Sequence, residues 1–510
     1  MCGILFTNDP KILEASFRRA LSLMNHRGPD ASGYWTNEEA KLGHTRLKIV
    51  DLDDRSNQPF WSADRRYLIV FNGEIYNYRQ LAIEHRISRH TTCDTEIILE
   101  LYARLGPDCV AQLNGMFAFV IFDTHTSEYF AARDRLGVKP LYVCTRNGRL
   151  TLASEMAPML ELTGIGPLDE VGLRQYRKLR TFFNGSTIYA GVQMFPAGHY
   201  MVNGKLVQYW RLPEGEQSPP SDEEVRALIA ESVQMRRIAD VPLGSYLSGG
   251  LDSTIIAALV GKTHTWTVGF ADENEFSWSR LASKALGTTH HEVLVSPDEF
   301  VELARAMIRK RREPLSVPNE VLLYKMTSEA RRYNTVILSG EGADELFFGY
   351  DRIFRWAARA KTFDLIEFDR LYSYSQTNDL EIVESVVAPF LHWKTPALIV
   401  AAFFQCAHLH GLLRRLDNST MLCSVEARVP FVDHHPLVER LAGVSATYRM
   451  KDGVVKAPLK RAFRNILPAE IIDRPKVGFP VPLANIPFPS DDTQTPMDRW
   501  LEFNLNVLTS

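Results

Sequence analysis

Residues 243–253 read LGSYLSGGLDS, an apolar run that leads directly into paired glycines, an aspartate and serines. The run Leu243–Leu247 predicts a strand, and the residues from about Thr254 onward predict a helix. Glycines at such a junction let the backbone approach a phosphate group, and the free N–H groups at a helix start favour an anion. The segment lacks the lysine of the GxxxxGK phosphate loop, so it predicts either another kind of phosphate-binding turn or an ordinary strand-to-helix turn.

Further along, strand-like runs alternate with helical stretches, which is typical of a parallel sheet built from βαβ units. The runs Thr265–Phe270 and Thr335–Leu338 predict two more strands, and from about residue 354 the pattern is mostly helical. The second run leads into SGEGADE, residues 339–345. Asp252 and Asp344 could jointly hold Mg²⁺, which prefers carboxylate and phosphate oxygens. Taken singly, each is also compatible with a solvated carboxylate.

The first two hundred residues have a different pattern, with strands joined by turns. Aromatic and β-branched residues predict strands at Tyr67–Phe71, Met116–Phe122 and Glu128–Arg133. Helical periodicity is confined to Lys11–Leu23 and Thr95–Leu105. The sequence therefore predicts a sheet-rich first half and a second half in which helices and parallel strands alternate.

The chain has 510 residues, which at about 100–200 residues per domain predicts two to four domains. The stretch Leu212–Glu223, LPEGEQSPPSDE, is rich in proline, serine and acids and has no periodicity. We therefore divide the chain into a first domain, residues 2–210, a linker, residues 211–224, and a second domain, residues 225–510.

Charge and composition exclude several classes of protein. The formal net charge is −3, which gives no electrostatic footprint for nucleic acid or an anionic membrane. Six scattered cysteines without a CxxC pair argue against a zinc site or a disulfide framework. The start MCGILFTNDP lacks a signal-peptide pattern, and the longest apolar run, Ala397–Phe404, is shorter than the about 20 residues that span a bilayer. We expect a cytoplasmic protein.

Cys2 follows the initiator methionine, and its small side chain would permit removal of Met1. Removal would leave a free α-amine, which titrates at about 7.7–8.0, beside a thiol that titrates at about 8.5. The amine could then accept the thiol proton directly or through one water, which would make Cys2 a nucleophile. On position alone, a small residue at a chain end is the commoner case.

Other polar groups of the first half could serve such a nucleophile. Asn72 and Gly73 follow the predicted strand Tyr67–Phe71, and an amide and an N–H at a turn can stabilise an oxyanion. A lone Asn-Gly pair is equally the signature of a hairpin turn. Arg46 and Asp94 could bind the carboxylate and ammonium groups of an amino acid, although each alone is typical of a solvated surface charge.

Six motifs occur in an order that resembles the glutaminase domain of class II glutamine amidotransferases: MCGI (1–4), RGPD (27–30), GHTRL (43–47), NGEIYN (72–77), CDTE (93–96) and RDRLGVKPLY (133–142). The resemblance implies that Cys2 attacks the glutamine amide and releases ammonia. It also implies that Asn72 and Gly73 form the oxyanion hole, and that glutamine is held by Arg46, Asn72, Glu74 and Asp94.

SGGLDS and SGEGADE, with TVGF (267–270), LGTTHHE (286–292), EARVPFVD (426–433) and RPKVGF (474–479), resemble the PP-loop ATP pyrophosphatase domain of asparagine synthetases. Together the two resemblances cover residues 2–480 and indicate the glutamine-dependent asparagine synthetase family. They imply an α/β and α+β two-domain fold. The first domain would be an αββα N-terminal-nucleophile sandwich, and the second a parallel-sheet PP-loop domain with additional helices.

The implied reaction uses ATP and Mg²⁺ to convert a substrate carboxylate into an acyl-adenylate, which ammonia then attacks. Asp252 and Asp344 would hold the metal, Lys456 would stabilise the transition state, and Glu341 would act as the general base. The ATP-binding residues implied by the motifs are Leu247, Ser248, Gly249, Gly250, Asp252, Ser253, Val268 and Gly340.

The chain departs from the family pattern in places that concern the acceptor. β-Lactam synthetases have a tyrosine where Glu341 stands and lack a working N-terminal cysteine, so Cys2 and Glu341 favour amidation between two molecules. Phe348 replaces a glycine of the family's LFGGY, and Arg312 replaces an aspartate. The arginine that binds the aspartate α-carboxylate is not placed by the motifs, and Arg414 or Arg415 is a candidate for it.

The leading hypothesis is an ATP- and glutamine-dependent ligase that converts L-aspartate to L-asparagine and releases AMP and pyrophosphate. The same chemistry on another carboxylic acid, of a specialised or sugar pathway, is one alternative, and a nucleotide-binding regulator without catalysis is another.

The pairs His290-His291 and His434-His435 are interpreted as structural, because neighbouring residues on a strand point to opposite faces. A homodimer is expected only as the commonest oligomer, and the tail after Pro480 contains no interpretable motif.

Overall fold

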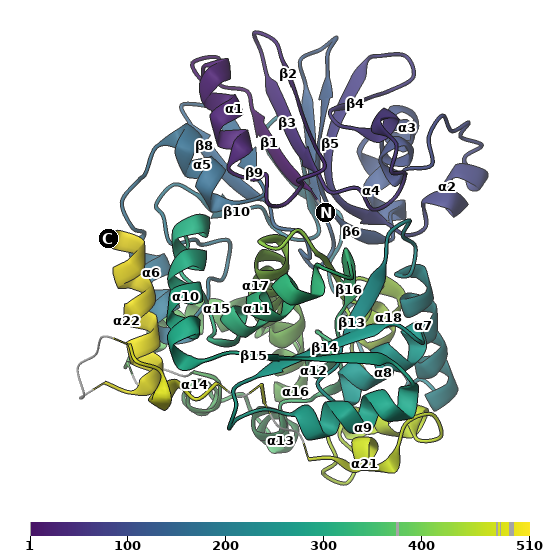
Figure 1. Cartoon of the computed structure of the whole chain (residues 1–510), viewed down its shortest axis with the longest axis vertical. Helices are drawn as coiled ribbons and strands as arrows, with labels where there is room; N and C mark the ends of the chain where they lie inside the picture. The colour runs from purple at the N-terminus through teal and green to yellow at the C-terminus, as the bar shows by residue number, and fades with distance from the viewer. Residues whose placement is uncertain (1, 374–376, 476–477, 480, 489–493) are drawn as a thin grey trace.

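The computed structural model describes residues 2–373, 377–475, 478–479, 481–488 and 494–510. Within these residues the chain forms two domains (Figure 1), a sandwich of two six-stranded sheets followed by a five-stranded sheet surrounded by helices. The amino-terminal end of the chain lies where the two domains meet (Figure 1). The expected sandwich and parallel-sheet domains are both confirmed.

The first domain stacks its two sheets face to face. One sheet has the strand order β10 (Gln193–Met194), β8 (Tyr142–Arg146), β9 (Arg149–Ala153), β1 (Gly3–Thr7), β3 (Lys41–Arg46), β2 (Ala31–Thr36). The other has the order β12 (Lys205–Gln208), β11 (His199–Val202), β7 (Tyr129–Arg133), β6 (Gly115–Asp123), β5 (Tyr67–Ile75), β4 (Phe60–Trp61).

Helices cover the outer faces of the sandwich, which gives the αββα order. The first sheet packs against α1 (Glu14–Ser22) and α5 (Met156–Thr163), and the second packs against α3 (Asp94–Leu105). The remaining helices of this domain are α2 (Tyr78–Glu84), α4 (Cys109–Gln112) and α6 (Glu170–Leu179).

Strand β6 shows why the sequence folds in layers. Its residues GMFAFVIFD are all buried, because each face of the strand packs on a different layer. Ala118, Val120 and Phe122 join the cluster between the sheets, whereas Phe117 and Phe119 pack into the cluster that contains α3. A strand buried on both faces therefore appears as a continuous apolar run rather than an alternating one.

The second domain is built on an all-parallel sheet with the order β15 (Thr289–Leu294), β14 (His264–Gly269), β13 (Leu243–Tyr246), β16 (Val336–Leu338), β17 (Glu426–Arg428). The chain starts at β13 and builds outward first on one side and then on the other. Ligands of such sheets bind at the carboxyl ends of the strands where the order reverses. Ser245 of β13 is paired with Leu338 of β16, so SGGLDS and SGEGADE lie side by side at that point.

The helices of the second domain are α7 (Asp222–Met235), α8 (Leu251–Val260), α9 (Phe276–Leu286), α10 (Pro297–Arg311), α11 (Asn319–Ala330), α12 (Ala343–Phe347), α13 (Asp351–Arg359), α14 (Leu365–Tyr372), α15 (Leu380–Val387), α16 (Pro396–Phe403), α17 (Leu409–Met421), α18 (His435–Leu441), α19 (Ala446–Arg449), α20 (Ala457–Phe463), α21 (Ala469–Asp473) and α22 (Pro496–Thr509).

Two helix boundaries and one strand differ from the sequence prediction. Helix α8 begins at Leu251 rather than Thr254, directly after Gly250, so Asp252 lies in its first turn. Helix α7 begins at Asp222, inside the predicted linker 211–224, because the Ser221 hydroxyl accepts a hydrogen bond from the Glu224 N–H and caps it. Strand β17 lies in the region predicted as helical, and three residues are too few for a periodic signal.

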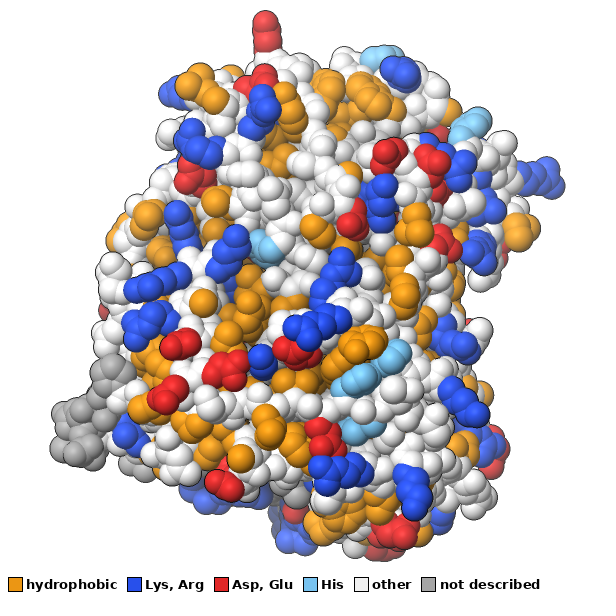
Figure 2. Space-filling view, viewed as in Figure 1, with side chains coloured by type: hydrophobic (Ala, Val, Ile, Leu, Met, Phe, Trp, Pro, Cys, Tyr) orange, Lys and Arg blue, Asp and Glu red, His pale blue; other side chains and the backbone are white. Residues whose placement is uncertain are grey.

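One continuous helical segment of the described chain, Pro396–Met421, is long and apolar enough to cross a membrane by length and composition. It comprises α16, a π-helical turn at Phe404–His408 and α17. Within the molecule, 78% of its apolar window is buried, which is the pattern of a core helix. On the face shown in Figure 2, acidic and basic side chains are interspersed, as a net charge of −3 suggests.

The carboxyl-terminal segment, left without a role by the sequence, is an integral part of the core. Helix α22 packs against α10 and α6. The Trp500 side chain is fully buried against Phe300 and Phe488, with ring centroids 5.8 Å away in each case. The side-chain Oδ1 of Asn504 accepts a hydrogen bond from the Leu315 N–H at 2.8 Å.

We expect Trp500→Ala to lower the free energy of unfolding by about 3–5 kcal/mol, the usual cost of replacing a buried tryptophan by alanine. Denaturant unfolding of the full chain measures this. Asn506→Ala, at an exposed position of the same helix, should change the free energy of unfolding by less than about 0.5 kcal/mol. Equal effects of the two substitutions would contradict the packing of α22 described above.

Candidate active sites

The first site is a small pocket around Cys2, immediately before β1. Its lining includes Cys2, Arg46, Gly73, Glu74 and Asp94, five of the six residues that the resemblance assigns to glutamine hydrolysis. The pocket therefore brings together Cys2 with residues from β3, β5 and the start of α3. Burial raises the pKa of the Cys2 thiol, so a base must take its proton before it can act as a nucleophile.

Gly73 lies within strand β5, not at the turn that the Asn-Gly pair suggested. It stands opposite Phe117 of β6. The Phe117 N–H donates to Asp134 Oδ2, and the Phe117 carbonyl oxygen accepts from the Asp134 N–H, just after β7. Because both main-chain groups of Phe117 bond away from β5, Gly73 and Phe117 are a non-hydrogen-bonded pair, and the Gly73 N–H points away from β6. A Cβ atom here would lie 2.0 Å from the Met116 carbonyl oxygen, so the strands can approach this closely only at a glycine.

The neighbours of Gly73 on the same edge of β5 show where its N–H points. Two residues before it, the Phe71 N–H donates to Gln58 Oε1 at 2.6 Å. Two residues after it, the Ile75 N–H donates to Asp94 Oδ2 at 2.8 Å. Gln58 and Asp94 both line the Cys2 pocket. The Gly73 N–H is therefore directed into the pocket between them.

Asn72 is joined to the site through the main chain of Cys2. Its Oδ1 accepts a hydrogen bond from the Cys2 N–H at 3.0 Å. Its Nδ2 is buried and has no hydrogen-bond partner in the described part of the chain. Buried amide donors are nearly always paired, so this Nδ2 group is available to donate a hydrogen bond to a bound ligand.

The Arg46 guanidinium group is fixed by the loop after β3. It donates to the Asp53 carbonyl oxygen and to Asn57 Oδ1, each at 2.8 Å, and to the Asp51 carbonyl oxygen. The described structure gives it no carboxylate partner. Its charge therefore remains available to an anionic group in the pocket.

Acidic side chains converge on the other side of the pocket. Burial raises the pKa of Asp94 to about 6, and burial together with the Asp94 charge raises the pKa of Glu74 well above its usual value. Glu426 of β17, in the second domain, adds to both effects. Arg428 donates to Glu426 at 2.6 Å and lies 3.6 Å from Glu74. Three carboxyl groups thus face one guanidinium, an arrangement that favours binding of an ammonium group.

The second site is a cavity of about 680 Å³ at the carboxyl ends of β13, β14 and β16. Of the residues predicted for ATP, it is lined by Leu247, Ser248, Gly250, Asp252, Ser253, Val268 and Gly340, and Glu341, Asp344 and Lys456 line it too. Gly249 is the exception. A Cβ atom there would lie 2.4 Å from the Trp278 main chain, so Gly249 allows close packing on α9 rather than contact with the cavity.

Hydrogen bonds of Ser248 and Ser253 fix the turn that leads from β13 into α8. Ser253 Oγ accepts the Ser248 N–H at 3.2 Å, and the Gly250 N–H donates to Ser248 Oγ at 3.2 Å. Helix α8 has ten residues, and its first three, Leu251, Asp252 and Ser253, line the cavity, so the helix begins at the cavity. Such a helix start favours a phosphate group.

Lys456 lies between the two predicted metal ligands. Its ammonium group is 2.5 Å from Asp252 Oδ2 and 2.5 Å from Asp344 Oδ1, and both carboxylates raise its pKa. The two carboxylates thus converge on one point that already holds a cation. Mg²⁺ is commonly held by one or two carboxylates together with substrate phosphates, so this donor set fits the metal once nucleotide is bound.

Glu341 forms an ion pair that its motif did not indicate. Arg415 Nη2 donates to Glu341 Oε1, and Arg415 Nη1 donates to Asn319 Oδ1 at 3.2 Å. Arg414, the other candidate for the acceptor carboxylate, turns the opposite way and donates to Thr181 Oγ1 at 3.2 Å. Arg415 therefore lies beside Glu341, which lines the cavity, and Arg414 points away from it.

Several cationic residues of the cavity were given no role from the sequence. Arg474 lies within the quoted motif RPKVGF, whereas Lys460 and Arg355 lie in none of the quoted motifs. Arg474 is paired with Glu275, and Arg355 with Asp351. Lys476 and Val477 of the same motif lie outside the described residues.

The two departures from the family pattern have local structural effects. Phe348 does not line the cavity. It is fully buried, stacks on Phe354 at 4.0 Å between ring centroids and lies beneath Arg449. Arg312 ends α10 with a positive φ, and its neighbour Glu313 accepts the Tyr142 hydroxyl at 2.8 Å. Phe348 is therefore a packing variation, and Glu313 joins the two domains.

The adjacent histidines take part in hydrogen bonds. His290 contacts Thr265 and Ser279, and His291 contacts His264 at 2.8 Å. His434 Nδ1 lies 3.4 Å from Arg236 Nη1, and His435 Nδ1 lies 3.4 Å from Glu439 Oε1. These contacts agree with a structural role for both pairs. The strand argument holds only for His290 and His291 of β15, because His434 and His435 lie at the start of α18.

Comparison with known proteins identifies the family. Residues 224–503 match Asparagine synthase, and residues 1–210 match the Glutamine amidotransferase domain. The chain is 30% identical to asparagine synthetase (glutamine-hydrolyzing) 1 of Bacillus subtilis, over 95% of this chain and 87% of that protein. It is 31% identical to synthetase 3 of the same organism, over 94% and 87%. It is 28% identical to asparagine synthetase B of Escherichia coli, over 94% and 82%.

These matches cover both sites described above. They join an amidotransferase domain to a synthetase domain in the order in which the two folds occur here. The chain therefore belongs to the asparagine synthase family, and it is a carbon–nitrogen ligase of the glutamine-hydrolysing type.

Proposed function

We propose that the chain makes L-asparagine from L-aspartate, glutamine and ATP, releasing glutamate, AMP and pyrophosphate. The observation that carries the proposal is the pairing, in one chain, of a nucleophile pocket at Cys2 with the nucleotide-sized cavity at the SGGLDS and SGEGADE loops. The names of the relatives agree with it.

In the first site, the Cys2 thiolate would attack the glutamine amide carbon. Removal of Met1 would turn the Cys2 N–H that now contacts Asn72 into a free amine, which accepts the thiol proton and later gives it to the leaving ammonia. Asn72 Nδ2 and the Gly73 N–H would stabilise the oxyanion. Glu74 and Asp94 would bind the substrate ammonium, and Arg46 its carboxylate.

In the second site, ATP would lie with its adenosine along Leu247, Val268 and Gly340 and its phosphates at residues 248–253. The acceptor carboxylate would attack the α-phosphorus, forming the acyl–phosphate bond as pyrophosphate leaves. Mg²⁺ held by Asp252 and Asp344 would neutralise charge on the phosphates. Lys456 would stabilise the same charge, and Glu341 would accept a proton from the ammonia that displaces AMP.

Arg415 is the best candidate to bind the α-carboxylate of the acceptor. It is buried, it lies beside Glu341, and its guanidinium can bind a carboxylate through two parallel hydrogen bonds. An arriving carboxylate would compete with Glu341 for Arg415 and so release the base for catalysis. Another carboxylic acid as acceptor is an outcome of the test below, as is a regulator without catalysis. The homodimer and the cytoplasmic location stay predictions.

The first test is pyrophosphate release from the purified chain with Mg²⁺, ATP and glutamine, with and without L-aspartate. We expect strong dependence on aspartate and formation of asparagine, detected by mass spectrometry. Cys2→Ala should abolish the use of glutamine and leave synthesis from ammonia intact. Asp344→Asn should abolish synthesis from both nitrogen sources and spare glutamine hydrolysis.

The outcomes separate the candidates. Glutamine hydrolysis without an aspartate response would move the acceptor to another carboxylate. ATP binding without pyrophosphate release for any acceptor would favour the regulator. Loss of ammonia-dependent synthesis in a folded Cys2→Ala variant would contradict the division into two sites.

Glutamine binding should weaken in acid. An ammonium group binds the ionised form of Asp94, whose pKa is raised to about 6 in the empty pocket. As pH falls through 6, Asp94 becomes neutral, so kcat/KM for glutamine hydrolysis should fall by up to about tenfold per pH unit below that value. Asp94→Asn should give a low value with a flatter acid limb. An equally steep limb in this variant would assign the titration to another group.

We expect Arg415→Lys to raise the KM for the acceptor by about tenfold or more, because lysine cannot reproduce a bidentate contact. The KM for ATP should change by less than about twofold. Steady-state synthesis from ammonia measures both constants. Arg359→Lys, at an exposed position of α13, serves as the matched control. Equal increases for acceptor and ATP would indicate general damage to the cavity rather than loss of acceptor recognition.

A further inference from the structure

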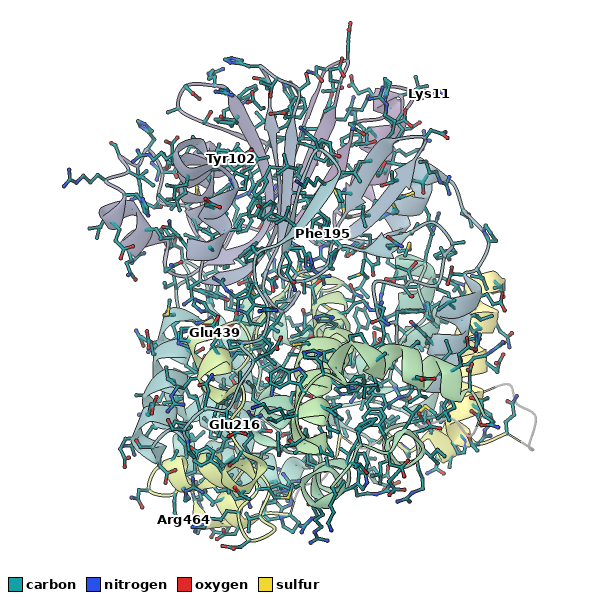
Figure 3. The ribbon with its side chains drawn as sticks, turned by 180° about the vertical axis from the view of Figure 1, so that it is seen from behind. Lys11, Tyr102, Phe195, Glu216, Glu439 and Arg464 are labelled. Carbon is teal, nitrogen blue, oxygen red and sulfur yellow. The ribbon has the colours of Figure 1, made fainter. Side chains whose placement is uncertain are left out.

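A third cavity, of about 420 Å³, lies between the two domains and shares no lining residue with either site above. The first domain and the linker contribute Phe182, Phe195 and Trp210, and the second contributes Trp393, Gly411 and Arg414. Phe195 lies at the level where the two domains meet (Figure 3). The proposed reaction has no use for this cavity.

The charges that line the cavity are mostly positive. Its lining contains four arginines, Arg133, Arg135, Arg211 and Arg414, all within the described chain. The lining holds one carboxylate, Glu214, which lies 3.6 Å from Arg211 and 3.6 Å from His392. The other three guanidinium groups therefore have no lining carboxylate within ion-pair distance.

Two of these arginines donate their hydrogen bonds to carbonyl oxygens and form no ion pair within the described chain, although the Asp134 carboxylate is close enough to act on both charges. Arg133 is buried and donates to the carbonyl oxygens of Lys139, Phe195 and Gly137 at 2.5–2.9 Å. Arg135 donates to the carbonyl oxygens of Leu113 and Ala111. Carbonyl groups satisfy the donors, but they leave the net charge in place. The cavity therefore keeps a positive potential.

Arg414 reaches the cavity from α17. The residue is 8% exposed, its guanidinium lies 4.8 Å from the centroid of the Phe182 ring, and it donates a hydrogen bond to the Thr181 hydroxyl. The described chain offers it no carboxylate. Burial of a guanidinium group without a counter-charge is costly, and an anion in the cavity would offset that cost.

The remaining walls are flat and apolar. Aromatic rings come from both domains, with Phe182 and Trp210 on one side and Phe390 and Trp393 on the other. His410 lies near Arg133 and is kept neutral, because burial and that charge lower its pKa to about 3. A neutral imidazole can donate one hydrogen bond and accept another. Such walls suit a flat organic group next to an anion.

We propose that this cavity is a binding site for a small organic anion with a flat apolar body, whose charge is recognised by Arg414. Helix α17 connects this site to the two reaction centres. Arg414 faces the cavity, Arg415 pairs with Glu341, and Asp417 pairs with Arg27 at 2.9 Å. The adjoining π-helical turn Phe404–His408 also contributes Cys406 and Ala407 to the lining, and such turns often occur at functional sites. Any effect of the ligand on synthesis rests on the proposed function, but its binding does not.

The test uses 1-anilinonaphthalene-8-sulfonate with the full chain, followed by fluorescence titration. We expect saturable binding with one site per chain. The uncharged N-phenyl-1-naphthylamine, which has the same aromatic body, should bind about tenfold more weakly or worse. Because Trp210 and Trp393 line the cavity, excitation of tryptophan should give probe emission by energy transfer, and Trp393→Phe should reduce it.

Arg414→Gln should weaken sulfonate binding by about tenfold, and Arg414→Lys should retain most of it. Lys460→Gln, which removes a cation from the nucleotide cavity instead, is the matched control and should leave the affinity unchanged. Thermal unfolding checks that the variants fold. The proposal is overturned if the two probes bind equally well, or if Lys460→Gln weakens binding as much as Arg414→Gln. If Arg414→Gln does not fold, the affinities of the two probes for the unchanged chain still test whether the cavity recognises an anion.

Discussion

The arrangement of the two domains depends on one buried guanidinium group, that of Arg27. Its Nε donates to the Cys2 carbonyl oxygen at 3.0 Å, its Nη1 donates to Glu155 at 3.0 Å, and its Nη2 donates to Asp417 of α17 at 2.9 Å. The side chain is fully buried, so loss of the cation would leave two buried carboxylates without it, a change that typically costs about 3–5 kcal/mol. Arg27 thus fixes the position of Cys2 relative to the helix that carries Arg415.

A second junction makes the pocket around Cys2 a structure shared by both domains. Glu426 and Arg428 belong to β17 of the second domain, yet they set the charge around Glu74 and Asp94 of the first. The Arg428 carbonyl oxygen accepts a hydrogen bond from the Ser339 N–H at 2.8 Å, at the start of the loop SGEGADE. An ammonium group bound at Glu74 therefore changes the electrostatic balance of a strand that also supports the nucleotide loop.

The sequence was sufficient for the order of layers, and its motifs contain most of the residues that line the two candidate sites, because long apolar runs and ordered motifs are local signals. It failed where a decision depends on tertiary contacts. Asn72 and Gly73 look like a hairpin turn, but pairing of β5 with β6 continues through them. Arg414 and Arg415 are neighbours in sequence, and only the rotation of α17 separates one that faces a cavity between domains from one that faces Glu341. Strand β17 is too short to be recognised without its partner β16.

The charges around Lys456 indicate that nucleotide binding at the proposed site would require a further cation. Asp252, Asp344 and Lys456 together carry a net charge of −1, in a cavity where Arg474 and Arg355 are already paired with carboxylates. A polyphosphate brought to the N–H groups of α8 would add several negative charges next to that cluster. Backbone dipoles, Lys456 and Lys460 are too few to balance them, because Coulomb repulsion between like charges at hydrogen-bond distance is strong in a partly dehydrated cavity. Phosphate binding and divalent cation binding are therefore expected to be coupled, each raising the affinity for the other.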